Sequence, residues 1–170
     1  MRLKTILTNN FCSYIIQMTG NSQEDITYMR LALRQAEEAV ETGDVPVGAV
    51  IVRGKTVIAR AHNQTELLKD PTAHAEMIAI TQAASAVGDW RLTECALYVT
   101  KEPCPMCAGA ITLARIPRVV FGAYDPINSG LVKSAEVSGG VLEDECKELL
   151  QNFFKTLRTQ AKNSFPKQDS

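Results

Sequence analysis

Apolar and polar positions recur along this chain with the periods of both helices and strands. Over residues 22–43 the apolar side chains fall at helical spacing and charged side chains occupy the other faces. This stretch therefore predicts a helix that ends at Gly43. Its apolar set comprises Ile26, Met29, Leu33, Ala36 and Val40. Two mainly apolar runs follow, 47–52 and 56–61, and the turn Arg53-Gly54-Lys55 between them predicts a hairpin of buried strands.

Later segments continue the pattern. Residues 75–87 carry alanine, methionine and isoleucine on more than one side, as expected for a helix covered by a sheet and by another helix or a second subunit. A strand is expected over 97–100, a helix over 107–115 and a strand over 119–123. The order α-β-β-α-β-α-β up to residue 123, followed by a last helix over 143–158, predicts an α/β fold. This fold is a three-layer α-β-α sandwich around a central mixed sheet.

The last predicted helix has an apolar stripe that is expected to pack on the core. The stripe comprises Leu142, Cys146, Leu149, Leu150, Phe153 and Leu157. Phe154 lies beside it, and Lys155, Arg158 and Lys162 follow. An aromatic ring with nearby cations suits base stacking and phosphate contact on RNA, but it equally suits a solvated tail. Both interpretations stay open, and residues 159–170 are expected to form a C-terminal polar tail.

Composition narrows the class of protein. The 170 residues, 45% hydrophobic and 22% charged, are enough for one ordinary globular domain, expected over 23–158. A net charge of −1 gives no global basic field, although a local basic patch can still bind RNA. Five cysteines without a disulfide framework are typical of a reducing cytoplasm. The apolar positions of residues 1–22 are too interrupted for a membrane span or a signal peptide, so a disordered extension or a misplaced start before Met18 is expected.

Two short stretches carry the candidate chemistry, His74-Ala75-Glu76 and Pro103-Cys104-Pro105-Met106-Cys107. His74, Cys104 and Cys107 supply three zinc ligands, and a catalytic zinc site keeps its fourth position for water. The i, i+3 cysteines fit one side of the first turn of a helix, where proline is also favoured. Glu76 would face the same cavity without being a ligand, as a proton shuttle requires.

Each stretch also has a simpler interpretation. A lone C-x-x-C is often redox-active or structural, and H-x-E alone is weaker still. A closed four-ligand zinc site would need another ligand, but His62, Cys12, Cys95 and Cys146 stand singly along the chain. Those three cysteines are expected to be small apolar residues of a reduced interior. The sequence therefore favours an open, catalytic zinc site.

The combined H-x-E and P-C-x-x-C pattern resembles the zinc-dependent nucleobase deaminases. The stretches 44–50, 70–76, 97–104 and 115–123, with Phe153-Phe154, are similar to the bacterial tRNA-specific adenosine deaminases, or TadA-like proteins. The resemblance implies a cytidine deaminase-like fold, one Zn²⁺ per subunit and a homodimer. It also implies hydrolysis of adenosine to inosine at the wobble position of a tRNA anticodon stem-loop, with Glu76 moving the proton. Asn63, Ala75, Asp125 and Phe154 match positions that would contact the substrate.

One segment departs from this family. TadA-like proteins carry an added helix and a basic loop after the fourth strand, whereas only about a dozen residues separate Ala123 from Val137 here. Because a parallel crossover needs at least about that many residues, the fifth strand is expected to be displaced, reversed or missing. Lys101 also stands at a position that is usually apolar in the family, and Tyr124 at one often basic. These differences leave open a deaminase of a free nucleobase, such as guanine, cytosine or adenine, on the same zinc site.

Overall fold

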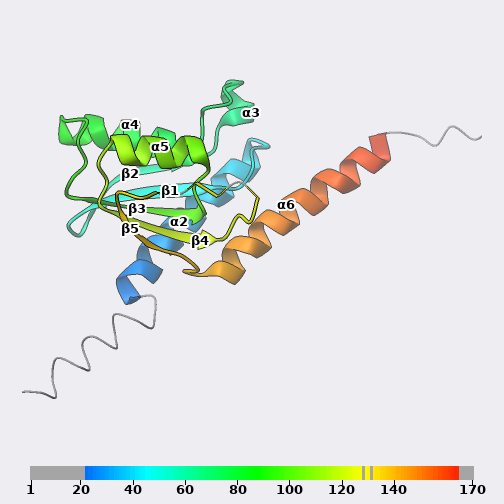
Figure 1. Ribbon diagram of the computed structural model, residues 1–170. Coiled ribbons are helices and arrows are strands. Elements are labelled where there is room, and N and C mark those ends of the chain that lie inside the picture. Colours follow the sequence, from blue (N-terminus) through cyan, green and yellow to red (C-terminus); the bar gives the residue numbers. More distant parts are fainter. Residues whose placement is uncertain (1–21, 128, 131, 165–170) are drawn as a thin grey trace, which may run out of the picture.

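The core of the protein is a mixed five-stranded sheet with strand order β2-β1-β3-β4-β5 (Figure 1). The computed structural model describes residues 22–127, 129–130 and 132–164. The strands are β1 (Gly48–Arg53), β2 (Thr56–His62), β3 (Cys95–Lys101), β4 (Arg118–Ala123) and β5 (Glu136–Ser138). β1 pairs antiparallel with β2 and β3, whereas β4 pairs parallel with β3 and β5. The predicted hairpin and mixed sheet are thus confirmed. Only β1 is buried as expected, whereas β2 lies at the edge of the sheet and exposes Thr56 and Arg60.

Helices cover both faces of this sheet. α2 (Gln23–Glu41) and the first half of α6 (Glu143–Ser164) lie on one face, and α4 (Ala75–Val87) and α5 (Pro105–Leu113) lie on the other (Figure 1). A single turn, α3 (Thr65–Leu68), follows β2 and was not expected from the sequence. The arrangement confirms the three-layer α-β-α sandwich. None of the described helices has both the length and the apolar character needed to cross a membrane.

Alternation along the strands produces two cores, one on each face. Ile51, Leu97 and Val119 pack under α4 and α5, while Val50, Tyr98 and Val120 pack under α2 and α6. This is the period of two expected of strands buried on both faces. Gly48 lets α2 approach closely, because a Cβ there would lie 2.0 Å from the backbone oxygen of Ala32.

A buried charge network fixes the start of α2 to the sheet. Ser22 caps the helix by accepting a hydrogen bond from the backbone N–H of Asp25 at 3.0 Å. The Asp25 carboxylate accepts hydrogen bonds from the Tyr98 hydroxyl at 3.1 Å and from the Arg118 guanidinium at 3.1 and 3.2 Å. Burial works against the charged form, but hydrogen bonds from Ser22, Arg118 and Tyr98 together hold the pKa of Asp25 below its ordinary value.

The C-terminal helix is longer than the sequence predicts. α6 continues to Ser164 rather than ending near Arg158, so the first residues of the expected polar tail are helical. Cys146 is fully buried, whereas Leu157 is 43% exposed, because the second half of the helix extends away from the sheet (Figure 1). Only the first half of the apolar stripe therefore packs on the core as expected. Residues 1–21, which make up nearly all of the expected N-terminal extension, lie outside the described residues.

The fifth strand is present and runs parallel beside β4, with Val119 paired to Val137. The expectation of a displaced, reversed or missing strand is therefore wrong. Residues 124–135 make this connection, and those of them that the structure describes contain no helix. They suffice because β5 has only three residues, and twelve residues can extend to roughly 40 Å, well beyond the length of β4.

Candidate metal and catalytic site

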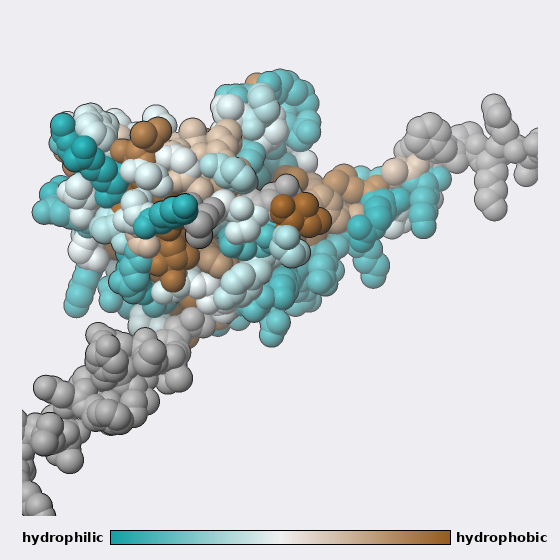
Figure 2. All heavy atoms as spheres, viewed as in Figure 1, coloured by the Kyte–Doolittle hydropathy of each residue, from teal (hydrophilic) through white to brown (hydrophobic). Residues whose placement is uncertain are grey.

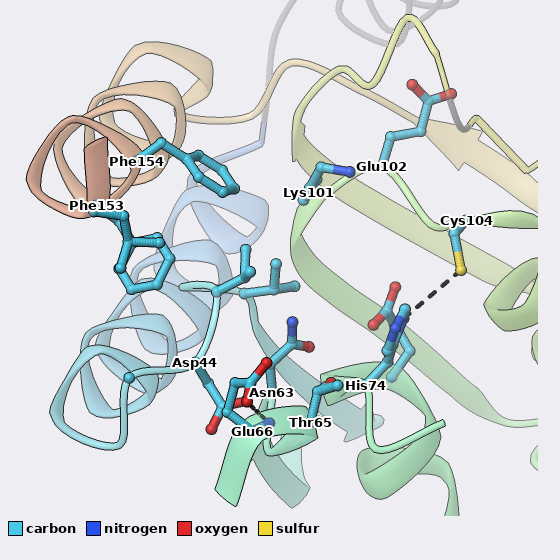
Figure 3. Close-up of a pocket in the computed structure, with 15 residues that line it drawn as sticks. Asp44, Asn63, Thr65, Glu66, His74, Lys101, Glu102, Cys104, Phe153 and Phe154 are labelled. Carbon is cyan, nitrogen blue, oxygen red and sulfur yellow. Dashed lines mark hydrogen bonds between the residues drawn. The ribbon is translucent and has the colours of Figure 1, made fainter. Parts of the chain in front are cut away.

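The three predicted metal ligands converge where two helices begin. His74 is the N-cap of α4, Cys104 is the N-cap of α5, and Cys107 lies in the first turn of α5. Nδ1 of His74 lies 3.7 Å from Sγ of Cys104 (Figure 3). It lies 3.5 Å from Sγ of Cys107. Pro105 occupies the first turn of α5, where its missing N–H leaves no bond unmade. The positive end of the helix dipole at this position favours the thiolate form that a metal ligand requires.

These separations fit a tetrahedral metal ion. Metal–sulfur bonds of about 2.3 Å and metal–nitrogen bonds of about 2.0–2.1 Å at the corners of a tetrahedron would place nitrogen and sulfur roughly 3.6 Å apart. The two observed separations lie on either side of that value, and all three donor atoms lie within 4.8 Å of one another. Among the described residues no fourth histidine, cysteine or carboxylate joins this cluster. The donor set therefore suits zinc with one position open.

The other candidate ligands lie elsewhere. His62 pairs with Glu38, with Nδ1 3.6 Å from the carboxylate. Cys95 and Cys146 are buried free thiols, as expected for small apolar residues of the interior, and Cys146 packs in the core under α2. Burial raises the pKa of the Cys146 thiol to about 12. Cys12 lies outside the described residues.

Glu76 occupies the first turn of α4, two residues after His74. Its side chain is only 4% exposed but lines the same cavity as His74 and Cys104. Burial raises the pKa of the Glu76 carboxyl, while a backbone hydrogen bond and the neighbouring His74 act in the opposite direction. The carboxylate stands beside the cluster without belonging to it, which is the position that proton transfer requires.

A cavity of about 380 Å³ opens in front of these groups. His74 and Cys104 lie at one end, and Phe153 and Phe154 of α6 lie at the other (Figure 3). Glu76 and Leu157 also line the cavity. The volume is within the range of small-molecule sites. In Figure 2, α6 extends to the right of the rest of the molecule. Hydrophobic residues lie along its upper edge and hydrophilic residues along its lower edge.

Asn63 follows β2 and connects the cavity to the start of α4. Its Oδ1 accepts a hydrogen bond of 2.9 Å from the backbone N–H of Ala75, and both residues are buried. Asn63 lines the cavity, whereas Ala75 does not. The predicted substrate contacts by Asn63 and by the backbone near Ala75 stay predictions. The structure adds a role that the sequence did not reveal, since Asn63 satisfies one of the unpaired amides at the beginning of this helix.

The two remaining predicted contacts differ in their surroundings. Phe154 is 41% exposed, lines the cavity, and packs edge-on against Phe153 with ring centroids 5.5 Å apart. Asp125 is buried and does not line the cavity. It forms an ion pair with Lys101 and accepts a 3.0 Å hydrogen bond from the backbone N–H of Ile127. A direct contact of Asp125 with substrate stays a prediction, while Lys101 is the residue of this pair that reaches the cavity.

The short connection after β4 packs against the loop that carries Cys104. The backbone N–H of Gly130 donates to the carbonyl of Pro103 at 2.7 Å, and a Cβ on Gly130 would lie 2.5 Å from the carbonyl oxygen of Cys104. Glu102 accepts hydrogen bonds from the backbone N–H of Asp125 at 2.9 Å and from the Ser129 hydroxyl at 2.5 Å. Sequence reasoning missed this role of Glu102 because its partners lie more than twenty residues away.

Asp44 was also missed. It accepts hydrogen bonds from the backbone N–H groups of Glu66 at 2.6 Å and Leu67 at 3.2 Å, so it caps α3 from a distant loop. No local pattern reveals such a cap, because the usual signal is a residue directly before the helix.

Comparison with known proteins gives consistent results. A profile of the MafB19-like deaminase family matches residues 23–158. A tRNA-specific adenosine deaminase of Bacillus subtilis (strain 168) is 48% identical over 151 residues, which cover 82% of this chain and 94% of the relative.

Solved structures show the same fold. One, from a study of A-to-I editing by tRNA:A34 deaminases at the wobble position of transfer RNA, is 43% identical with a TM-score of 0.70. The match covers 73% of this chain and 99% of that one. A guanine deaminase of Bacillus subtilis is 41% identical with a TM-score of 0.56, over 62% of this chain and 66% of that one. These likenesses confirm the expected cytidine deaminase-like fold.

Proposed function

The chain belongs to the family of the tRNA-specific adenosine deaminases, and we propose that it hydrolyses adenosine to inosine at the wobble position of a tRNA anticodon, using zinc. One observation carries the proposal: a buried carboxylate, Glu76, lies beside an open cluster of His74, Cys104 and Cys107 at the end of a cavity. An open cluster with an adjacent non-ligating carboxylate suits hydrolysis, whereas a structural zinc site has no use for that carboxylate.

The residues divide the reaction between them. Zinc held by the three ligands would supply a water molecule whose pKa is lowered toward neutrality. Glu76 accepts a proton from the attacking water as the new C–O bond forms at the amine-bearing ring carbon. It then returns that proton to the exocyclic nitrogen, so that the C–N bond breaks and ammonia leaves. Adenosine and water thus become inosine and ammonia. Asn63 holds the start of α4, and with it Glu76, through the amide of Ala75.

The rim of the cavity supports an RNA substrate. Phe154 offers an exposed aromatic face on the cavity, and bases of single-stranded loops stack on such faces. Beyond Phe154, α6 carries the exposed cations Lys155, Arg158 and Lys162, which suit phosphates of the anticodon stem-loop.

A free nucleobase is the second candidate substrate. The 41% identity to a guanine deaminase favours it, as does the short connection 124–135, whose described part adds no helix beside the cavity.

Product formation distinguishes these two substrates. The zinc-loaded protein is incubated with an anticodon stem-loop of an arginine tRNA bearing adenosine at the wobble position, and separately with a panel of free bases and nucleosides. A stem-loop with guanosine at the wobble position and adenosine elsewhere in the loop is the matched control. Inosine in the first substrate alone is the expected result. Ammonia from a free base, with both stem-loops inert, would overturn the proposal in favour of the second candidate.

We also propose a cytoplasmic homodimer. Support comes from the resemblance to the deaminase family, and Leu113 of α5, which is 76% exposed, is a residue that a second subunit on this layer would cover. The described cysteines outside the metal cluster, Cys95 and Cys146, are free thiols, in keeping with a reducing compartment. Sedimentation at working concentration tests the dimer, and a fully active monomer would contradict it.

A further inference from the structure

The cavity lining is unusually acidic for a site that takes a polyanion. Asp44, Glu66, Glu76 and Glu102 all line it. Among the described residues that line the cavity, Lys101 is the only lysine, and there is no arginine. Since carboxylates repel phosphates at this range, the position of this cation matters for any RNA that enters.

Three of these carboxylates have partners other than Lys101. Asp44 accepts the amides at the start of α3. Glu66 pairs with Lys69 at 3.2 Å, and Glu102 holds the connection after β4. Lys101 pairs instead with Asp125, which lies behind the lining. The Lys101 side chain is 30% exposed and that of Asp125 only 8%, so the cation of this pair is the member that solvent and substrate can reach.

Asp125 fixes where the ammonium sits. One carboxylate oxygen accepts from the backbone N–H of Ile127 at 3.0 Å, and the other pairs with Lys101. The backbone N–H of Asp125 is itself bound to Glu102 at 2.9 Å. An ammonium group has three donors, so one can stay on Asp125 while the others serve a ligand. Ordering lysine in advance lowers the entropy lost when a ligand binds.

Resting on the proposed function, we propose that Lys101, oriented by Asp125, forms a phosphate subsite for the RNA strand at the mouth of the cavity. Figure 3 shows Lys101 and the ring of Phe154 on the same side of the cavity, with His74 farther in. A nucleotide beside the target can therefore stack its base on Phe154 and place a phosphate on Lys101. A compact ammonium is a common phosphate contact of this kind.

The test measures how RNA binding depends on salt. Lys101→Met keeps the side-chain length but removes the charge, whereas Lys101→Arg keeps the charge. Affinity of each full-length, zinc-loaded variant for the anticodon stem-loop is measured over a series of KCl concentrations. Losing one phosphate contact lowers the slope of log K against log[salt] by about 0.7 and weakens binding about fivefold at low salt. We expect this for Lys101→Met, with a raised KM for the stem-loop and near-normal kcat. Lys101→Arg should resemble the wild type.

Two further variants separate a local contact from net charge and from folding. Lys55→Met removes an exposed lysine from the distant β1–β2 turn and should keep the wild-type slope. The double variant Lys101→Met, Asp125→Asn has the net charge of the wild type and leaves no buried carboxylate without its partner. It should still show the reduced slope of log K against log[salt] seen for Lys101→Met.

The outcomes distinguish the two proposals. If the wild type forms inosine but both variants lacking Lys101 keep its salt slope, the phosphate subsite is wrong and the proposed function stands. If the wild type deaminates only free bases, the proposed function is wrong, and the phosphate subsite falls with it.

Discussion

Replacing Glu76 by glutamine tests the chemistry most directly, because it removes a proton carrier and little else. The side chain is 4% exposed and lies beside the metal cluster without joining it. Glutamine has nearly the same volume and is neutral, so it creates neither a cavity nor a buried charge. We therefore expect Glu76→Gln to fold and to bind zinc as the wild type does.

The expected loss is confined to turnover. A positioned general acid–base contributes about 10²- to 10⁴-fold, which corresponds to about 3–5 kcal/mol of barrier. Single-turnover inosine formation at saturating enzyme should therefore slow by at least 100-fold, while RNA affinity changes little. Zinc content by mass spectrometry and affinity for the stem-loop are measured on the same preparations.

Glu66→Gln is the matched control. Glu66 lines the same cavity, but its side chain is exposed and pairs with Lys69. Its turnover should stay within about fivefold of wild type, since an exposed ion pair contributes less than about 1 kcal/mol. Glu76→Gln with full zinc and turnover within tenfold of wild type would refute the proton-shuttle assignment. Loss of zinc from this variant would instead show that Glu76 helps to hold the metal.

Three further predictions concern the framework of the site. Asn63→Ala leaves the first amide of α4 buried without an acceptor, so the free energy of unfolding should fall by about 1–3 kcal/mol, and an unchanged urea midpoint would contradict this. Gly130→Ala forces a methyl group against the carbonyl of Cys104 and should weaken zinc binding about tenfold in a chelator competition. Gly109→Ala, where an added Cβ meets nothing within 4 Å, is its control, and equal effects of the two would refute the clash. The pKa of Asp25 is lower in the folded state than its ordinary value of 3.8. The ionised Asp25 therefore stabilises the fold above pH 3.8, and this stabilisation is lost as the pH falls below that value. In urea unfolding from pH 7 to 3, Asp25→Asn should be less stable at pH 7 and lose less stability toward pH 3, and parallel curves would disprove the assignment.

The sequence predicted the layers because burial on both faces leaves a clear pattern. Strand residues such as Ile51 and Val50 face different cores, and both lie in one apolar run. Helix ends moved by one or two residues at α5, which begins at Pro105 rather than Cys107. α6 extended farther, because residues 159–164 contain no proline or glycine that would end the helix, and the next proline is Pro166.

The candidate site divides in the same way. His74, Cys104 and Cys107 were brought together by the sequence analysis because each sits at a helix start in a short local motif, and the structure places them within 4.8 Å. Two sets of contacts were not predictable, since they join segments more than twenty residues apart. They are the ion pair of Lys101 with Asp125 and the hydrogen bonds that Glu102 accepts from Asp125 and Ser129. Those contacts depend on how the short connection folds back.

The metal cluster and the rim of the cavity differ in how much similarity to relatives says about them. The metal cluster and Glu76 are set by the first turns of two helices that pack on the sheet core, so a change at the rim of the cavity leaves these residues in place. The rim is built from β3, the connection 124–135 and the outer half of α6. The connection and the outer half of α6 lie outside the sheet, so they can change in length or charge without disturbing it, and Lys101 at the end of β3 can change in charge. Substrate choice can therefore diverge while deamination is retained, and Lys101 lies on the part of the site where such divergence occurs.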